Sequence, residues 1–240
     1  IEAWTQNIRA LAEAGFRVIG YDYPGHGYTT HTDHDLEIPE YEEHLLALLD
    51  TLGLERPHLA GESLGGWVLV KFAQHHPDRV RSLILAAPGG RMVEEAKVDK
   101  VQSVNTAALQ APTYETVKQR LQVVIHNPDL ITDELVEVRR DIYGRPGFAE
   151  SARHIGVLRQ HDVRYRNRLE ESDYAQVAAP TLLVWTDHEP TGGVEVGELL
   201  AAALPNGELL TVAGAAHWPQ WEDPAVFNER AVAFLKGVDA

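Results

Sequence analysis

The sequence predicts an α/β fold in which a mostly parallel sheet carries helices on both faces. Short β-rich runs alternate with helical patterns near both ends of the 240-residue chain, which is typical of βαβ units. The middle of the chain lacks a convincing strand pattern, and its apolar residues recur at helical spacing. We therefore expect residues 1–90 and 179–240 to form one α/β core, and residues 91–178 to form a helical cap inserted into it.

Hydrophobic spacing and turn residues place each element of the core. An amphipathic helix opens the chain and ends at Ala14-Gly15, where glycine favours a helix stop. A second helix face, from Ile38 to Leu52, repeats apolar residues at steps of three and four. The remaining expected elements are strands at 16–22, 57–61, 81–87, 181–185 and 208–212, and helices at 64–75, 194–204 and around 227–235.

The expected cap is helical throughout. Val117, Leu121 and Val124 mark one apolar helix face in it, and a second face follows further along the chain. Open α/β sheets keep their ligand sites outside the carboxyl ends of the strands. We therefore expect the cap to lie over that edge of the sheet, above the site.

Composition excludes several classes of function. The chain has 21 Lys and Arg against 36 Asp and Glu, and a net charge of −15 repels nucleic-acid phosphates and anionic membrane surfaces. The absence of cysteine excludes disulfides, thiolate metal sites and cysteine nucleophiles. No apolar run approaches the ~20 residues of a membrane span. We expect a cytoplasmic protein with a small-molecule substrate; the sequence leaves the oligomeric state open, a homo-oligomer included.

A serine nucleophile is predicted between the second strand and the helix that follows it. Residues 61–65 read Gly-Glu-Ser-Leu-Gly and fit the pattern G-x-S-x-G. The glycines permit a cramped strand–turn–helix elbow that exposes the Ser63 hydroxyl, and the amide of Leu64 at the helix start is suited to stabilise an oxyanion. The alternative interpretation is a glycine-rich turn with an incidental serine.

A base and an acid are expected later in the chain. His217 follows the last strand and precedes the final helix, which is the terminal position in the order serine, acid, histidine. The acid should follow the strand that ends at Trp185, because it must orient the imidazole. Two carboxylates, Asp187 and Glu189, compete in that loop, and spacing alone leaves the choice open.

Six segments spread over nearly the whole chain carry a family resemblance. They are Asp22-Tyr-Pro-Gly-His-Gly27, Gly61-Glu-Ser-Leu-Gly-Gly66, His76-Pro-Asp-Arg-Val80, Pro88-Gly-Gly90, Ile131-Thr-Asp-Glu-Leu135 and Gly214-Ala-Ala-His-Trp-Pro-Gln-Trp-Glu222. The sequence resembles the α/β-hydrolases, and it is specifically similar to the meta-cleavage-product hydrolases. Those enzymes split carbon–carbon bonds in ring-opened aromatic compounds.

The resemblance implies roles for further residues. The family's acid directly precedes a proline or arginine, which favours Glu189 over Asp187 and departs from the usual aspartate. The family's substrate-carboxylate arginine corresponds to Arg139, for which a solvated helix arginine is the alternative. Trp218 resembles the family's active-site tryptophan, or it is simply a packed core aromatic.

The reaction implied by the resemblance is hydrolysis of a 2-hydroxy-6-oxo-dienoate. Arg139 would bind the substrate, His217 would assist its ketonisation, and Ser63 would attack the 6-keto carbon to give an acyl-enzyme. No cofactor or metal is implied. The alternatives are a carboxylesterase with the same triad, and a small-molecule-binding protein of this fold without catalysis.

Two departures from the family pattern are visible. Glu62 stands where several family members have asparagine. The family's N-terminal strands, with a His-Gly-rich loop that supplies a second oxyanion amide, would precede Ile1. The sequence resembles the family without those strands.

Overall fold

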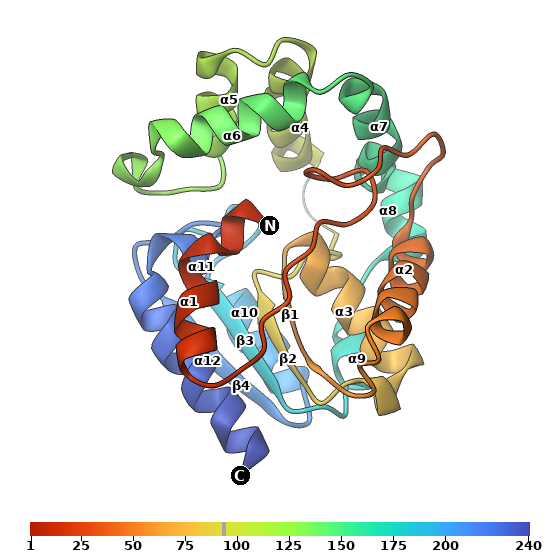
Figure 1. Ribbon diagram of the computed structural model, residues 1–240, viewed down its shortest axis with the longest axis vertical. Coiled ribbons are helices and arrows are strands. Elements are labelled where there is room, and N and C mark those ends of the chain that lie inside the picture. Colours follow the sequence, from red (N-terminus) through yellow and green to blue (C-terminus); the bar gives the residue numbers. More distant parts are fainter. Residues whose placement is uncertain (93–94) are drawn as a thin grey trace.

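The computed structural model describes residues 1–92 and 95–240 (Figure 1). Within them, the strands β1 (His58–Glu62), β2 (Ser82–Ala86), β3 (Thr181–Thr186) and β4 (Gly207–Val212) form one sheet in the order β1-β2-β3-β4. Every neighbouring pair is parallel. The α/β fold with a parallel sheet, predicted from the alternation of strand and helix patterns, is confirmed.

Helices cover both faces of this sheet (Figure 1). Because parallel strands need crossover connections, at least one helix lies between each strand and the next along the chain. One face carries α2 (Ile38–Thr51), α3 (Leu64–His75), α9 (Glu171–Tyr174) and α10 (Val194–Ala203). The other carries α1 (Thr5–Glu13), which follows a 3₁₀ turn η1 (Glu2–Trp4), together with α11 (Pro219–Glu222) and α12 (Pro224–Asp239).

The strands divide the core into two layers, since successive side chains point to opposite faces of a sheet. On β2, Leu83 and Leu85 pack with α2 and α3, whereas Ile84 and Ala86 pack with α12. All five residues of β2 and all six of β3 are buried. Strands apolar on both faces are typical of a sheet with helices on each side. None of the described helices is long and apolar enough to cross a membrane.

The strand expected at residues 16–22 is wrong. The segment is irregular, and in the described part of the chain no backbone hydrogen bond joins residues 17–22 to β1. Strand propensity becomes a strand only where a neighbour completes the ladder of hydrogen bonds. The segment instead crosses from α1 towards α2 as a loop (Figure 1). The other strands and helices expected for the core form, with ends shifted by a few residues at most.

The described residues between 95 and 178 contain helices and no strand. These helices are α4 (Glu95–Gln110), α5 (Tyr114–Leu121), α6 (Asp133–Gly144), α7 (Phe148–Ile155) and α8 (His161–Asn167), besides α9, with 3₁₀ turns η3 (Pro128–Leu130) and η4 (Gly156–Arg159). Helices α4 to α7 lie beyond the carboxyl ends of the strands (Figure 1). Thr132 begins α6 by accepting a hydrogen bond from the Leu135 amide at 3.1 Å, a typical N-cap.

Apolar contacts join the helical segment to the core at two places. Trp218 and Trp221 pack with α5 and α6, so the end of α11 anchors those helices. From Val157 onward, residues of η4, α8 and α9 belong to the same buried cluster as α3. Residues from Val157 onward therefore pack against the core, although they lie within the 91–178 segment that the sequence analysis assigns to the cap.

Candidate active site

Ser63 lies at the turn between β1 and α3. Its backbone has φ 50° and ψ −109°, an unfavourable conformation that costs on the order of 1–3 kcal/mol. The turn is held by hydrogen bonds from the Ser63 amide to the Ala86 carbonyl (3.0 Å) and from the Gly89 amide to the Ser63 carbonyl (2.8 Å). A Cβ at Gly61 would come within 2.5 Å of the Gly65 carbonyl carbon, so glycine is required there. The motif thus forms the expected elbow.

Leu64 is the first residue of α3. The first backbone N–H groups of a helix have no intrahelical acceptor, and they lie at the positive end of the helix dipole. The Leu64 amide is therefore the backbone donor next to the Ser63 hydroxyl, as the motif predicts for one half of an oxyanion site.

Three residues distant in sequence meet at this elbow. His217 Nε2 lies 2.8 Å from Ser63 Oγ, and His217 Nδ1 lies 2.7 Å from Glu189 Oε2. An ionised carboxylate only accepts hydrogen bonds, so Nδ1 carries the proton and Nε2 is left to accept from the serine hydroxyl. This is the geometry of a nucleophile, a base and an orienting acid.

Glu189, rather than Asp187, reaches the histidine. The Glu189 side chain is fully buried, and its second oxygen accepts hydrogen bonds from the Thr191 amide (3.0 Å) and hydroxyl (2.8 Å). Burial opposes ionisation, but His217 and Thr191 hold the pKa of Glu189 below its ordinary value. Asp187 is exposed and accepts from the Gly214 amide at 2.8 Å. Glu189, which follows Asp187 by two residues and has the longer side chain, is therefore the carboxylate that contacts His217.

The loop that carries the histidine is fixed by contacts that sequence reasoning missed. The His217 amide donates to the Val124 carbonyl at 3.0 Å, which joins the loop to the segment after α5. Glu222 accepts from the Ala216 amide at 2.7 Å with one oxygen and from the His126 amide at 2.7 Å with the other. The only sequence signal for Glu222 was its place at the end of the His-Trp-Pro-Gln-Trp-Glu segment.

Glu62, immediately before the nucleophile, also faces the histidine. Its Oε1 lies 3.2 Å from His217 Nε2, the atom that faces Ser63, and makes no hydrogen bond with any described residue. Burial raises the pKa of Glu62 to about 7, although His217 opposes the shift. Burial alone would lower the pKa of His217, but Glu189 and Glu62 together raise it to about 9. The site thus contains a second carboxylate that stabilises the protonated imidazole.

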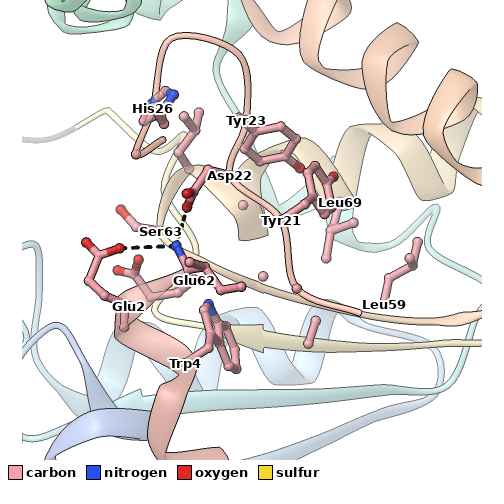
Figure 2. A pocket seen from close by; sticks show the side chains of 18 of the residues that line it. Glu2, Trp4, Tyr21, Asp22, Tyr23, His26, Leu59, Glu62, Ser63 and Leu69 are labelled. Carbon is pink, nitrogen blue, oxygen red and sulfur yellow. Dashed lines mark hydrogen bonds and ion pairs between the residues drawn. The ribbon is translucent and has the colours of Figure 1, made fainter. Parts of the chain in front are cut away.

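These groups open into a cavity of about 720 Å³. Figure 2 shows Ser63 and Glu62 within it, facing Glu2 from the N-terminal turn and His26 from the loop before α2. Residues from α4 to α7 and η4 also line the cavity, so it lies between the core and the helices above it.

Arg139 and Trp218 both line this cavity. The Arg139 guanidinium forms an ion pair with Glu2, donates to the Tyr143 hydroxyl at 3.2 Å, and lies 5.0 Å from the centre of the Trp218 ring. Burial would lower the pKa of Arg139, but Tyr143, Glu2 and Glu62 raise it above its ordinary value. Trp218 is also a core aromatic, with only 5% of its surface exposed. The two residues expected to bind substrate therefore lie together in the cavity that contains Ser63.

Two more arginines in the cavity, Arg120 and Arg159, were missed. Arg120 lies on α5, and Arg159 ends η4. No sequence signal distinguishes either one, because the cap is rich in arginine and most of these side chains form contacts elsewhere.

The fold and the elbow define a class of enzyme, and comparison with known proteins identifies the family. The family model described as alpha/beta hydrolase fold matches residues 1–224. The chain belongs to this α/β-hydrolase family and is an enzyme with hydrolase activity.

Its curated relatives include enzymes of aromatic degradation. The chain is 32% identical over 241 residues to a 2-hydroxy-6-oxononadienedioate/2-hydroxy-6-oxononatrienedioate hydrolase of Paraburkholderia phymatum, covering 96% of this chain and 80% of that protein. It is 29% identical over 244 residues to a 2-hydroxy-6-oxo-6-phenylhexa-2,4-dienoate hydrolase of Comamonas testosteroni, covering 96% and 81%. The resemblance to meta-cleavage-product hydrolases, seen in the motifs, is confirmed.

Solved structures share the fold. A meta-cleavage product hydrolase from Pseudomonas fluorescens IP01 superposes with a TM-score of 0.84 at 23% identity, covering 98% of this chain and 85% of that one. A thermophilic esterase from Thermogutta terrifontis superposes with a TM-score of 0.80 at 21% identity, covering 99% and 86%. One fold thus serves both C–C hydrolases and esterases, and the chemistry must be argued from the site.

Proposed function

We propose that this hydrolase cleaves the C–C bond of a 2-hydroxy-6-oxo-dienoate by a serine mechanism. The observation that carries the proposal is the presence of Arg139 and Trp218 in the same cavity as the Ser63–His217–Glu189 constellation. A carboxylate-bearing substrate needs a cation next to the nucleophile, and a planar guanidinium suits a carboxylate. The similarity to hydrolases of such dienoates supports the same substrate class.

The reaction begins with binding and ketonisation. The substrate carboxylate lies against Arg139, and helices α4 to α7 act as the cap that covers it. His217 helps to move the proton of the 2-hydroxyl group to C5, which converts the dienol into a keto form. This step prepares C5 to leave as a stabilised carbanion.

Cleavage then follows through an acyl-enzyme. His217 Nε2 takes the Ser63 proton while Oγ bonds to C6, and the C6 oxyanion accepts a hydrogen bond from the Leu64 amide. The C5–C6 bond breaks, and C5 receives the proton from His217. Water, deprotonated by His217, attacks the acyl carbon and releases the acid with free Ser63. Glu189 holds the imidazole in the required tautomer throughout.

A direct test compares two substrates. The purified enzyme should decolourise a 2-hydroxy-6-oxo-dienoate, whose conjugated dienol absorbs in the visible region, and release stoichiometric amounts of two products identified by mass spectrometry. A neutral nitrophenyl ester serves as the comparison, since an esterase with the same triad would prefer it. Robust ester hydrolysis without dienoate cleavage would overturn the C–C assignment in favour of a carboxylesterase.

A further inference from the structure

Two peptide groups directly precede His217, and both of their carbonyl groups are held by the core. The Ala215 carbonyl accepts a hydrogen bond from the His188 amide at 3.1 Å. The Ala216 carbonyl accepts one at 2.7 Å from the hydroxyl group of Thr186, the last residue of β3. These two bonds attach the loop of the base to the end of β3 and to the loop that carries the proposed acid.

The N–H groups of the same two peptides are held by other parts of the chain. The Ala216 amide donates to Glu222 Oε1 at 2.7 Å, and the His217 amide donates to the Val124 carbonyl at 3.0 Å. Ala216 and Val124 are buried, so water does not readily replace a lost partner here. All four polar groups of the backbone before the base are thus satisfied, and a side chain, that of Glu222, supplies one of the acceptors.

Glu222 joins this loop to the cap. While its Oε1 accepts from the Ala216 amide, its Oε2 accepts from the His126 amide at 2.7 Å and from the Asn127 amide at 3.2 Å. Both of these amides belong to the 122–127 segment, which lies between α5 and η3. A carboxylate whose two oxygens accept from two separate segments holds those segments together.

Other residues account for the neighbouring helix end and for the attachment of the cap. Asp223, rather than Glu222, caps α12, since its side chain accepts from the Val226 amide at 3.1 Å. Trp218 and Trp221 anchor the cap, because they pack with α5 and α6. Glu222 therefore makes contacts that neither helix capping nor the packing of the cap requires.

The 122–127 segment also borders the active-site cavity. Val124 lines the cavity that contains the nucleophile. The ring of His126 stacks on the ring of His188, which directly precedes Glu189, with 3.7 Å between ring centres and 5° between planes. The segment thus contacts the loop of the acid, the loop of the base and the cavity.

We propose that Glu222 is a positioning residue, which aligns His217 with Ser63 by tying the backbone before the base to the 122–127 segment of the cap. The inference rests on the proposed function, because it concerns the base of that serine mechanism. His217 Nε2 lies 2.8 Å from Ser63 Oγ, and a misplacement of about 1 Å can cost on the order of 10²-fold in rate. Loss of the Glu222 contacts should therefore slow proton transfer from Ser63 more than it weakens substrate binding.

Glu222→Gln is the most direct perturbation. A carboxylate accepts with both oxygens, whereas an amide accepts with one oxygen and presents an NH₂ group that only donates. Glutamine has nearly the same shape, so its oxygen can accept either from the Ala216 amide or from the two amides of the cap, and its NH₂ group then faces another donor. One end of the bridge is lost without a change in side-chain size.

Labelling of Ser63 by a neutral fluorophosphonate measures its activation without any dienoate. Oγ bonds to phosphorus, fluoride leaves, and the serine proton passes to His217; mass spectrometry identifies the modified peptide, with Ser63→Ala as the blank. Well below its melting temperature, Glu222→Gln should be labelled with a second-order rate constant at least about tenfold lower than that of the wild type. Turnover of the dienoate or of the nitrophenyl ester should show a similar loss in kcat, with KM changed less than about threefold.

Two control variants separate alignment from stability. Glu229→Gln removes an exposed carboxylate of α12 and should leave the labelling rate and the melting temperature unchanged. Asn228→Ala removes hydrogen bonds with the Asn7 side chain and the Gln6 carbonyl, so it should lower the melting temperature without slowing labelling. If Glu222→Gln fails to fold, Glu222→Asp keeps the charge on a side chain one methylene shorter. That side chain cannot reach both segments, and labelling should be at least about threefold slower.

The outcomes distinguish the positioning role from the proposed function. Labelling of Glu222→Gln within about twofold of the wild-type rate, whatever its melting temperature, overturns the role and leaves the serine mechanism in place. If wild-type Ser63 is not labelled, the serine mechanism fails, and NMR of protein with isotope-labelled histidine tests the positioning by itself. The downfield resonance of the His217 Nδ1 proton, which is bonded to Glu189, should then shift or disappear in Glu222→Gln and persist in Asn228→Ala. An unchanged resonance in Glu222→Gln overturns the role.

Discussion

Glu62 offers the sharpest test of how charge controls this active site. Its carboxylate lies 3.2 Å from His217 Nε2, and its negative charge helps to raise the pKa of that histidine to about 9. A histidine must be neutral to take the serine proton. A raised pKa of His217 therefore shifts the onset of activity to higher pH. Glu62→Gln removes the charge and keeps the shape of the side chain. We expect it to lower the pKa of His217.

The expected shift can be worked out from the distance. Two unit charges 3.2 Å apart interact by about 1.3 kcal/mol even at the dielectric constant of water. That energy corresponds to about one pKa unit, and a less polar cavity makes it larger. The acid limb of the kcat/KM profile should therefore move at least about one unit towards lower pH. Activity at pH 7 should rise, and KM for an anionic dienoate should fall because a like charge is removed.

The assay is a pH–rate profile from about pH 5 to pH 10 for the wild type and two variants. Glu198→Gln is the matched control, since Glu198 is exposed on α10 and its charge is not among those that shift His217. The control should retain the wild-type acid limb. An unchanged limb in Glu62→Gln, or a shift towards higher pH, would refute the electrostatic coupling between Glu62 and His217.

Three further substitutions test the remaining assignments. Ser63→Ala should lower kcat at least about 10⁴-fold while the melting temperature stays close to wild type, and substantial residual turnover would exclude Ser63 as nucleophile. Glu189→Gln should lower kcat by roughly 10³–10⁴-fold and Asp187→Asn by far less, measured in parallel under saturating substrate; the reverse ranking would move the acid to Asp187. Arg139→Gln should lower kcat/KM for the dienoate by roughly 10²-fold and change nitrophenyl ester hydrolysis less than about threefold, whereas equal losses would indicate a structural arginine.

Local patterns in the sequence determined most of the core and two of the proposed catalytic residues. Strand and helix periodicity is a property of neighbouring residues, and the structure confirms β1 to β4 and the helices between them. The Gly61–Gly65 motif predicts a strained elbow because only certain residues fit such a turn, and Ser63 has the expected φ of 50°. His217 was found from its position after the last strand. The family resemblance was equally visible, because its motifs are short and contiguous.

Only the tertiary structure decided the features that depend on contacts between segments distant in sequence. Residues 17–22 have strand-like side chains, but no described strand pairs with their backbone, so the segment stays irregular. Spacing left Asp187 and Glu189 open, because the path of the loop and the length of the side chain determine which carboxylate reaches His217. The cavity arginines, Arg120 and Arg159, are indistinguishable in sequence from the surface arginines of the cap. Packing of the cap on the core places both side chains in the cavity, where an unpaired charge is costlier than in water.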